Sequence, residues 1–117
     1  PKRLVDVGLT DQSQIRIIYP RDQSLYLTVS HRWGEQTAHG ITLNDDTYKI
    51  LTQGYEYSKL PRLFRDCVHV TRRLGLRYVW IDSLCIRQDN DEEKIEEINK
   101  MGDIYAGSFC NILAVSA

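Results

Sequence analysis

The stretch 78–90, which reads YVWIDSLCIRQDN, passes abruptly from apolar to polar residues. Its first four residues are aromatic or aliphatic, and Asp82, Ser83 and Cys85 follow almost at once. A strand that is apolar on both faces is covered on both sides, as in a parallel sheet. In an open α/β sheet, ligands bind beyond the carboxyl ends of such strands. The stretch therefore predicts either a buried strand that ends at a pocket, or a turn capped by the Asp82 and Ser83 side chains.

Two segments with helical periodicity flank this strand. In the segment 60–75 the apolar residues form a single stripe, with Pro61 in the first turn and Gly75 at the stop. A second helix is expected after Asn90, which has capping-box spacing to Glu93. The apolar direction of this second helix is defined by Ile95, Ile98, Met101 and Tyr105.

Further apolar runs at 25–30 and 110–117 predict two more buried strands, and the segments 3–8 and 14–20 predict a short N-terminal strand pair. The polar segment 36–57 is interpreted as a loop that contains a short helix near 46–51. Strands that alternate with helices predict an α/β fold, with an open, mostly parallel sheet flanked by helices.

Composition sets further bounds on the function. The chain has 117 residues, enough for one domain, and its net charge of −1 gives no broad support for nucleic-acid binding. No apolar run reaches the roughly 18 residues that a membrane helix needs. Cys67, Cys85 and Cys110 are widely spaced and form no CxxC pair, so we expect no metal site and reduced thiols in a cytoplasmic protein.

Glu97 is the first candidate for catalysis. At 100° per residue it lies at the margin of the apolar stripe, whereas Glu96 points almost opposite and should face water. A carboxylate at such a margin is partly desolvated, a condition that suits catalysis. The alternative is a surface acid in a run of surface acids.

Sequence motifs give little support for a nucleophilic hydrolase or for a conventional nucleotide-binding fold. Ser30, His31 and Asp82 could supply a triad, but no G-x-S-x-G elbow is present and adjacent Ser and His side chains do not readily meet. A Cys85–His31 pair has no motif behind it either. The sequence also contains no G-x-x-x-x-G-K-[ST] and no G-x-G-x-x-G.

Several blocks together resemble a known family. PKRLVDVG, YLTVSHRWG, LGLRYVWIDSLCIRQD and EEINKMGDIYAGSFCNILAVSA are similar, in order, to the blocks of the fungal heterokaryon-incompatibility (HET) domain. The resemblance covers almost the whole chain, so 1–117 is expected to form a single HET domain. The chain departs from the family at the common S-Y-C-W-G, where it has His31 and Arg32, and at a frequent tryptophan, where it has Lys94.

The resemblance implies a module of non-self recognition that triggers programmed cell death as a form of innate immunity. HET domains are distantly similar to TIR domains, which implies a TIR-like, flavodoxin-like sheet. Several TIR domains cleave NAD with one helical glutamate, and Glu97 matches that position. NAD would then be a substrate, with no cofactor. The resemblance implies substrate contacts from Ser30, His31, Arg32, Trp33, Asp82, Ser83 and Cys85.

In a substrate pocket formed by these residues, Trp33 would stack on a flat ring and Arg32 would meet a phosphate, while Asp82 and Ser83 would fix either a ribose or the pocket floor. The alternative function is a non-enzymatic signalling module. Such a module would act by homotypic assembly, or with other death-signalling domains, through the arginines of 62–73.

Overall fold

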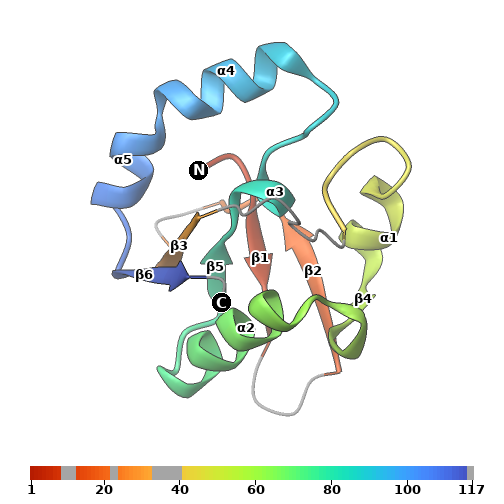
Figure 1. Ribbon diagram of the computed structural model, residues 1–117, viewed down its shortest axis with the longest axis vertical. Helices are drawn as coiled ribbons and strands as arrows, with labels where there is room; N and C mark the ends of the chain where they lie inside the picture. The colour runs from red at the N-terminus through yellow and green to blue at the C-terminus, as the bar shows by residue number, and fades with distance from the viewer. Residues whose placement is uncertain (9–12, 22–23, 33–40, 116–117) are drawn as a thin grey trace.

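The computed structural model describes residues 1–8, 13–21, 24–32 and 41–115. Their strands form a six-stranded sheet in the order β4-β2-β1-β5-β3-β6 (Figure 1). The strands are β1 (Leu4–Asp6), β2 (Gln14–Ile18), β3 (Tyr26–Arg32), β4 (Tyr55–Glu56), β5 (Tyr78–Trp80) and β6 (Cys110–Val115). An α/β fold is thereby confirmed.

The three strands predicted from apolar runs are neighbours, because β3 lies between β5 and β6 and runs parallel to both. The prediction that β6 is buried is wrong for its described start, because β6 is the last strand in the sheet order and Cys110 and Asn111 are exposed. Helical segments separate these strands in the sequence, as parallel pairing requires.

The expectation of a mostly parallel sheet is wrong. β1 is antiparallel to both β2 and β5, and β2 is antiparallel to β4, so the sheet is mixed. For the β1–β2 pair the physical reason is connection length, because two strands joined by a short turn pair antiparallel, whereas a parallel pair needs a long crossover. The predicted N-terminal strand pair is present as this antiparallel hairpin.

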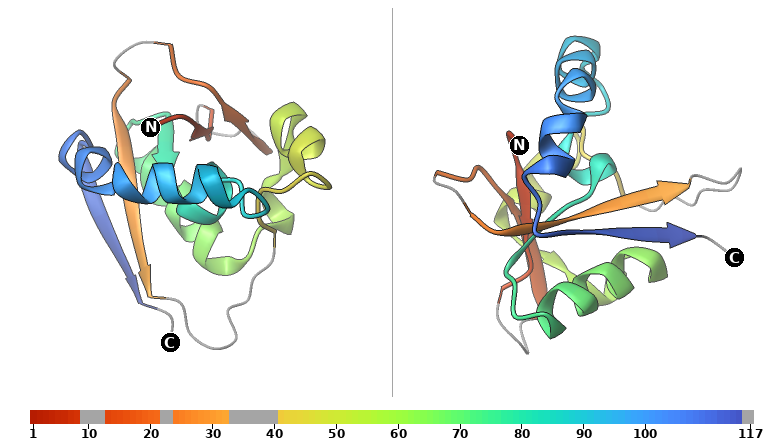
Figure 2. Two further views of the ribbon diagram at one scale, coloured as in Figure 1. Left: turned by 90° about the horizontal axis from the view of Figure 1, so that it is seen from above. Right: turned by 90° about the vertical axis from the view of Figure 1, so that its left-hand side faces the viewer.

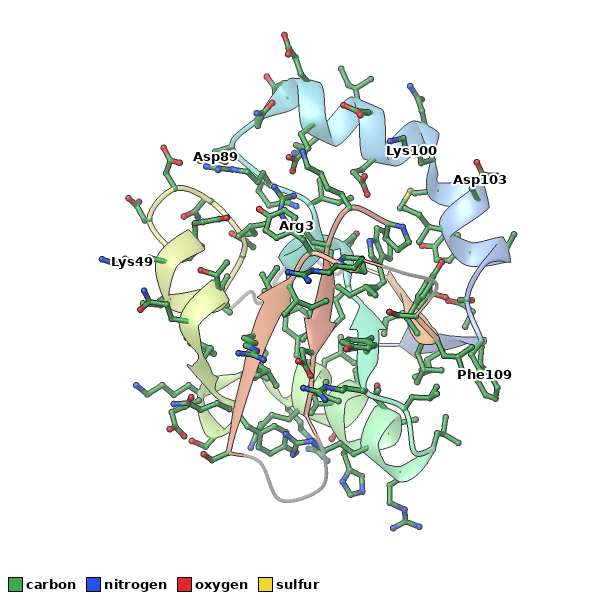
Figure 3. The ribbon with its side chains drawn as sticks, turned by 180° about the vertical axis from the view of Figure 1, so that it is seen from behind. Arg3, Lys49, Asp89, Lys100, Asp103 and Phe109 are labelled. Atoms are coloured by element: carbon green, nitrogen blue, oxygen red, sulfur yellow. The ribbon has the colours of Figure 1, made fainter. Side chains whose placement is uncertain are left out.

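Helices lie on both sides of the parallel strands. They are α1 (Tyr48–Gln53), the 3₁₀ helix η1 (Tyr57–Lys59), α2 (Arg62–Arg73), α3 (Asp82–Cys85), α4 (Asp91–Asn99) and α5 (Met101–Ala106). Figure 2 shows α2 on one side of β3 and β6, and α4 and α5 on the other. Seen from behind, β1 and β2 have no helix in front of them (Figure 3).

The helix predicted over 60–75 is confirmed as α2. It buries Phe64, Cys67 and Val68 against the sheet, and Leu60 lies buried just before it. The helix predicted after Asn90 is also present, but it ends at Asn99 and α5 begins at Met101. This interruption changes which residues of α4 face the core.

The core is continuous through the sheet. Trp80 is fully buried, and its ring meets that of Tyr105 edge to face with centroids 5.9 Å apart. Val5 and Val79, which pair across β1 and β5, are fully buried as well. Strand β5 is therefore covered on both faces, as its unbroken apolar run predicts.

Candidate functional site

The central strand ends in a single helical turn. After Trp80 the chain enters α3, where the Cys85 amide donates to the Ile81 carbonyl at 2.8 Å. The Ser83 amide donates to the Asp82 carboxylate at 2.7 Å, so the Asp82 side chain supports this turn. The Ser83 hydroxyl has no hydrogen-bond partner within the described residues, so the predicted capping is found for Asp82 and not for Ser83. The pocket at this strand end stays a prediction.

Ser83 and Cys85 face inward from α3. Ser83 is 5% exposed, and its hydroxyl oxygen has no hydrogen-bond partner among the residues described. Burial raises the pKa of the Cys85 thiol to about 12, so the thiol stays protonated. The negative charges of Asp82 and Glu97 add to that rise, which places both carboxylates near Cys85. A neutral, buried thiol is a poor nucleophile.

Glu97 is more deeply buried than its sequence position indicates. It is 2% exposed, and within the described part of the chain its Oε2 atom has no hydrogen-bond partner. Glu96 is exposed, as predicted, and its carboxylate lies 3.4 Å from the Lys100 ammonium. Glu97 therefore belongs to the inner face of α4.

The predicted apolar direction of this helix is wrong. Ile95 and Ile98 are 61% and 53% exposed, whereas the carboxylates of Glu93 and Glu97 point inward. The break at Lys100 separates the two isoleucines from Met101 and Tyr105, so the four residues do not form one stripe.

Glu93 anchors α4 and sets the orientation of this helix through its buried polar contacts. Its carboxylate receives two hydrogen bonds from the Arg3 guanidinium, at 2.6 and 3.0 Å, and lies 3.0 Å from the Lys2 ammonium. It also accepts the Arg87 amide at 2.8 Å. The hydrogen bonds from Arg3 lower the pKa of the Glu93 carboxyl to about 2. Arg3 is itself 3% exposed, so this is a buried ion pair.

Part of this anchor could be predicted from the local sequence. The capping box is present, because the Asn90 side chain accepts the Glu93 amide at 3.1 Å. Nothing in the local pattern links Glu93 to Arg3, which is 90 residues away along the chain.

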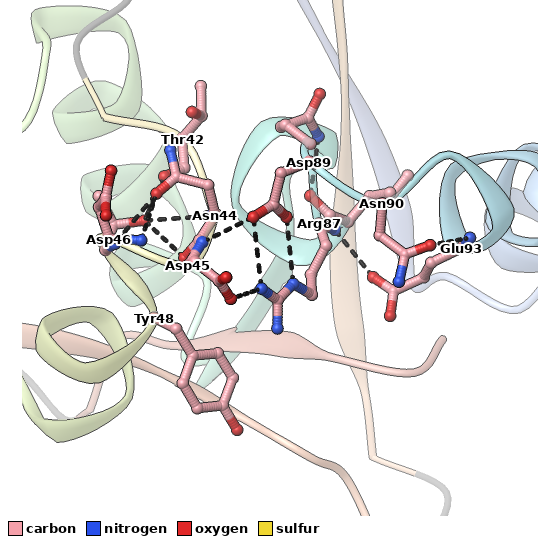
Figure 4. Close-up of polar contacts among 12 residues, drawn as sticks. Thr42, Asn44, Asp45, Asp46, Tyr48, Arg87, Asp89, Asn90 and Glu93 are labelled. Carbon is pink, nitrogen blue, oxygen red and sulfur yellow. Dashed lines mark hydrogen bonds and ion pairs between the residues drawn. The ribbon is translucent and has the colours of Figure 1, made fainter.

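A second polar cluster ties the strand-end loop to the segment before α1. Figure 4 shows the Arg87 guanidinium between the Asp89 and Asp45 carboxylates. The Asp45 amide also donates to Asp89 at 2.8 Å. Beneath this cluster, the Leu43 amide donates to the Ser83 carbonyl at 2.9 Å. Part of the predicted loop 36–57 is thus attached to α3.

The remaining predicted residues follow the neighbouring strand β3. This strand continues past Ser30 to Arg32, and the backbone of His31 pairs with that of Ala114 in β6. The side chains of Ser30, His31 and Arg32, and the whole of Trp33, lie outside the described residues. Because β3 and β5 are parallel, their carboxyl ends point in the same direction.

Within the described ranges, no three histidine, cysteine, aspartate or glutamate side chains gather as metal ligands would. None of the helices in the described part of the chain is long and apolar enough to cross a membrane.

Together these features define an open α/β fold with a mixed sheet, in which an acidic helix buries Glu97, whose Oε2 atom has no hydrogen-bond partner among the described residues. The chain belongs to the heterokaryon incompatibility protein (HET) family, whose family model matches residues 26–117. The predicted membership of this family is confirmed. The likeness to TIR domains stays a prediction.

Two curated relatives carry incompatibility names. Heterokaryon incompatibility protein 6, OR allele, of Neurospora crassa is 34% identical over 89 residues, which cover 71% of this chain and 13% of that protein. Vegetative incompatibility protein HET-E-1 of Podospora anserina is 34% identical over 77 residues, covering 65% of this chain and 5% of that protein. The chain thus spans a small part of either relative. No solved structure matches it significantly.

Proposed function

We propose that this chain is an effector module of fungal heterokaryon incompatibility, which kills by cleaving NAD with Glu97 as the catalytic carboxylate. Family membership and the names of both relatives support the role in incompatibility. The proposed chemistry depends on Glu97. We further propose that the module acts in the cytoplasm, where thiols such as Cys67 and Cys85 stay reduced.

The observation that supports the chemistry is that Oε2 of the buried Glu97 has no hydrogen-bond partner among the described residues. Burial of an ionised carboxylate without compensating partners costs several kcal/mol. A buried polar atom without a partner therefore calls for an explanation, and catalysis is a common one. Glu93 shows that the same helix can satisfy a buried carboxylate fully when its role is structural.

The reaction we propose is hydrolysis of the bond between nicotinamide and ribose. As this C–N bond breaks, its electron pair leaves with nicotinamide and positive charge develops on the ribose, which a nearby carboxylate stabilises. Water then adds to the ribose carbon and loses a proton, giving ADP-ribose. Glu97 would face the developing cation in this step.

The other predicted residues would hold the substrate. Asp82 and Ser83 would bind ribose hydroxyls, and the Ser83 hydroxyl has no hydrogen-bond partner among the described residues that would compete with such a bond. Arg32 would bind phosphate and Trp33 would stack on a ring, with Ser30 and His31 beside them. Cys85 would line the pocket without attacking, because its thiol is protonated.

A second candidate function, homotypic assembly, is favoured by the outer face of α4. Ile95 and Ile98 are more than half exposed there, beside the exposed acids Glu92 and Glu96. Exposed apolar residues with a charged rim are typical of protein interfaces. In this case the module would signal through contacts with other copies or other death-signalling domains.

One assay separates the two functions. Purified chain would be incubated with NAD, alone and fused to a domain that forces oligomers, and nicotinamide release would be measured. We expect cleavage by the wild type and a loss of about 100-fold or more in Glu97→Gln. Glu96→Gln is the matched control, because its exposed side chain should leave the rate unchanged.

A cell-killing assay on the same variants decides between the enzymatic function and the assembly function. If Glu97→Gln still kills and an Ile95→Asp, Ile98→Asp double variant does not, the assembly function replaces the enzymatic one. Equal rate losses in Glu97→Gln and Glu96→Gln would contradict a specific catalytic role for Glu97.

A further inference from the structure

A second polar region lies at the opposite end of β5 from Asp82. Two hollows there, with volumes of about 240 and 480 Å³, share the residues Asp6, Arg16 and Arg77. Asp6 pairs in register with Arg16 on β2 and with Tyr78 on β5, so these three side chains lie on one face of the sheet. The larger of the two hollows is also lined by Arg21, and we call it the arginine hollow.

The single carboxylate of the described lining is already committed to the fold. Asp6 is 6% exposed and accepts the Gly8 amide at 2.8 Å. It also accepts Nε and Nη2 of Arg77, at 2.9 and 3.2 Å, and lies 3.7 Å from Nε of Arg16. Asp6 therefore orients the Arg77 guanidinium by hydrogen bonds and lies near that of Arg16, but it balances only one charge.

The arginine hollow consequently has an excess of positive charge. Its described lining carries three guanidiniums, from Arg16, Arg21 and Arg77, against one carboxylate, although the chain as a whole has a net charge of −1. The Arg16 and Arg77 side chains are 54% and 47% exposed, so their outer N–H groups are open to solvent. Guanidiniums held in this way suit a phosphate group, which accepts paired hydrogen bonds.

The remaining lining consists of hydroxyl and aromatic groups. Ser24, Tyr19 and Tyr78 border the hollow, and the Arg77 guanidinium lies 5.9 Å from the centre of the Tyr78 ring. A volume of about 480 Å³ lies within the range of small-molecule sites and exceeds what one phosphate needs.

From this geometry we infer that the arginine hollow binds a ligand with at least two phosphate charges, either a free polyphosphate or a nucleoside diphosphate. The inference does not depend on NAD cleavage, because it uses none of the residues assigned to that reaction. It gives the module a second ligand site, at the amino end of the central strand.

The test is titration calorimetry of the 117-residue chain at low ionic strength, with inorganic pyrophosphate and with ADP as probes. We expect saturable binding that weakens as salt is added. An Arg16→Gln, Arg21→Gln double variant removes two of the three charges and leaves the Asp6–Arg77 pair intact, so affinity should fall about tenfold or more. The matched control is Arg62→Gln, Arg73→Gln on α2, which should change affinity less than about twofold.

Comparison of the probes identifies the source of the phosphates. Equal affinities would support a free polyphosphate, and tighter binding of ADP would support a nucleotide whose ring contacts Tyr19 or Tyr78. If the double variant does not fold, as judged by circular dichroism, Arg21→Gln alone carries the test, because Arg21 is exposed. Absence of saturable binding for both probes, or an equal loss in the control variant, would overturn the inference.

Discussion

Two carboxylates on the inner face of α4, one helical turn apart, have different environments. Glu93 is 7% exposed and Glu97 is 2% exposed, so water reaches neither freely. Glu93 has hydrogen bonds from Arg3, Lys2 and the Arg87 amide, whereas Oε2 of Glu97 has none among the residues described. Burial alone therefore does not distinguish a structural acid from a candidate catalytic one. The difference lies in the partners.

The positions of the two carboxylates are linked, because both depend on the orientation of α4. Because Arg3 and the Arg87 amide hold Glu93, α4 is oriented with that face inward, and Glu97 is carried into the interior by the same rotation of the helix. Hydrogen bonds satisfy the Glu93 carboxylate, whereas the burial of Glu97 costs free energy because Oε2 has no partner among the described residues. Substitutions at the two positions should separate these contributions.

The largest expected effect is the loss of Glu93. Glu93→Ala leaves the Arg3 guanidinium buried without its ion-pair partner, and we expect the free energy of unfolding to fall by about 3–5 kcal/mol. Urea denaturation measures this loss. Replacing both partners, with Arg3→Met and Glu93→Leu, should recover part of it. A loss below about 1 kcal/mol for Glu93→Ala would mean that Glu93 is no anchor.

A smaller loss of stability should follow acidification. The folded-state pKa of Glu93, at about 2, lies below its ordinary value of 4.5, so its contribution is complete above pH 4.5 and is lost as the pH falls toward 2. The shift corresponds to about 3 kcal/mol. Denaturation midpoints measured across this window should decline in the wild type. The decline should be much shallower in Glu93→Gln, and equal slopes would assign it to other carboxyls.

A still smaller change, of opposite sign, is expected at Glu97. Glu97→Gln keeps the shape and replaces a buried carboxylate, one oxygen of which has no hydrogen-bond partner among the described residues, so stability should stay the same or rise by about 1 kcal/mol. The same denaturation experiment measures it. If the variant instead loses more than about 2 kcal/mol, Glu97 has a structural partner and the contrast with Glu93 disappears.

The smallest effect is expected at Glu96. Its carboxylate is 64% exposed and faces the Lys100 ammonium at i,i+4 spacing, and an exposed pair of this kind contributes about 0.3–0.5 kcal/mol. Glu96→Gln should therefore change stability by less than about 0.5 kcal/mol, and added salt should remove that difference. A larger change would show that the outer face of α4 is engaged in further contacts.

The sequence alone predicted the elements whose causes are local. Helix α2 follows from a stripe of apolar residues between Pro61 and Gly75, and the start of α4 follows from the Asn90–Glu93 capping box. The pairing of β5, β3 and β6 followed from apolar runs separated by helical segments. Each of these signals lies within a short stretch of chain.

The site was predicted only in part. The sequence marked the residues after the central strand and Glu97, but it oriented α4 by Ile95 and Ile98, both of which are exposed. It also missed Arg3 and the arginine hollow, because their residues come from segments far apart in the chain.

Only the tertiary structure decided how the local elements combine. The order β4-β2-β1-β5-β3-β6 places an antiparallel hairpin beside parallel strands, a choice that depends on which edges meet and not on the pattern within any strand. The rotation of α4 depends on an ion pair between residues 90 positions apart. Local sequence determines helix and strand through backbone and periodicity, whereas the partners of buried charges are determined by distant residues that folding brings together.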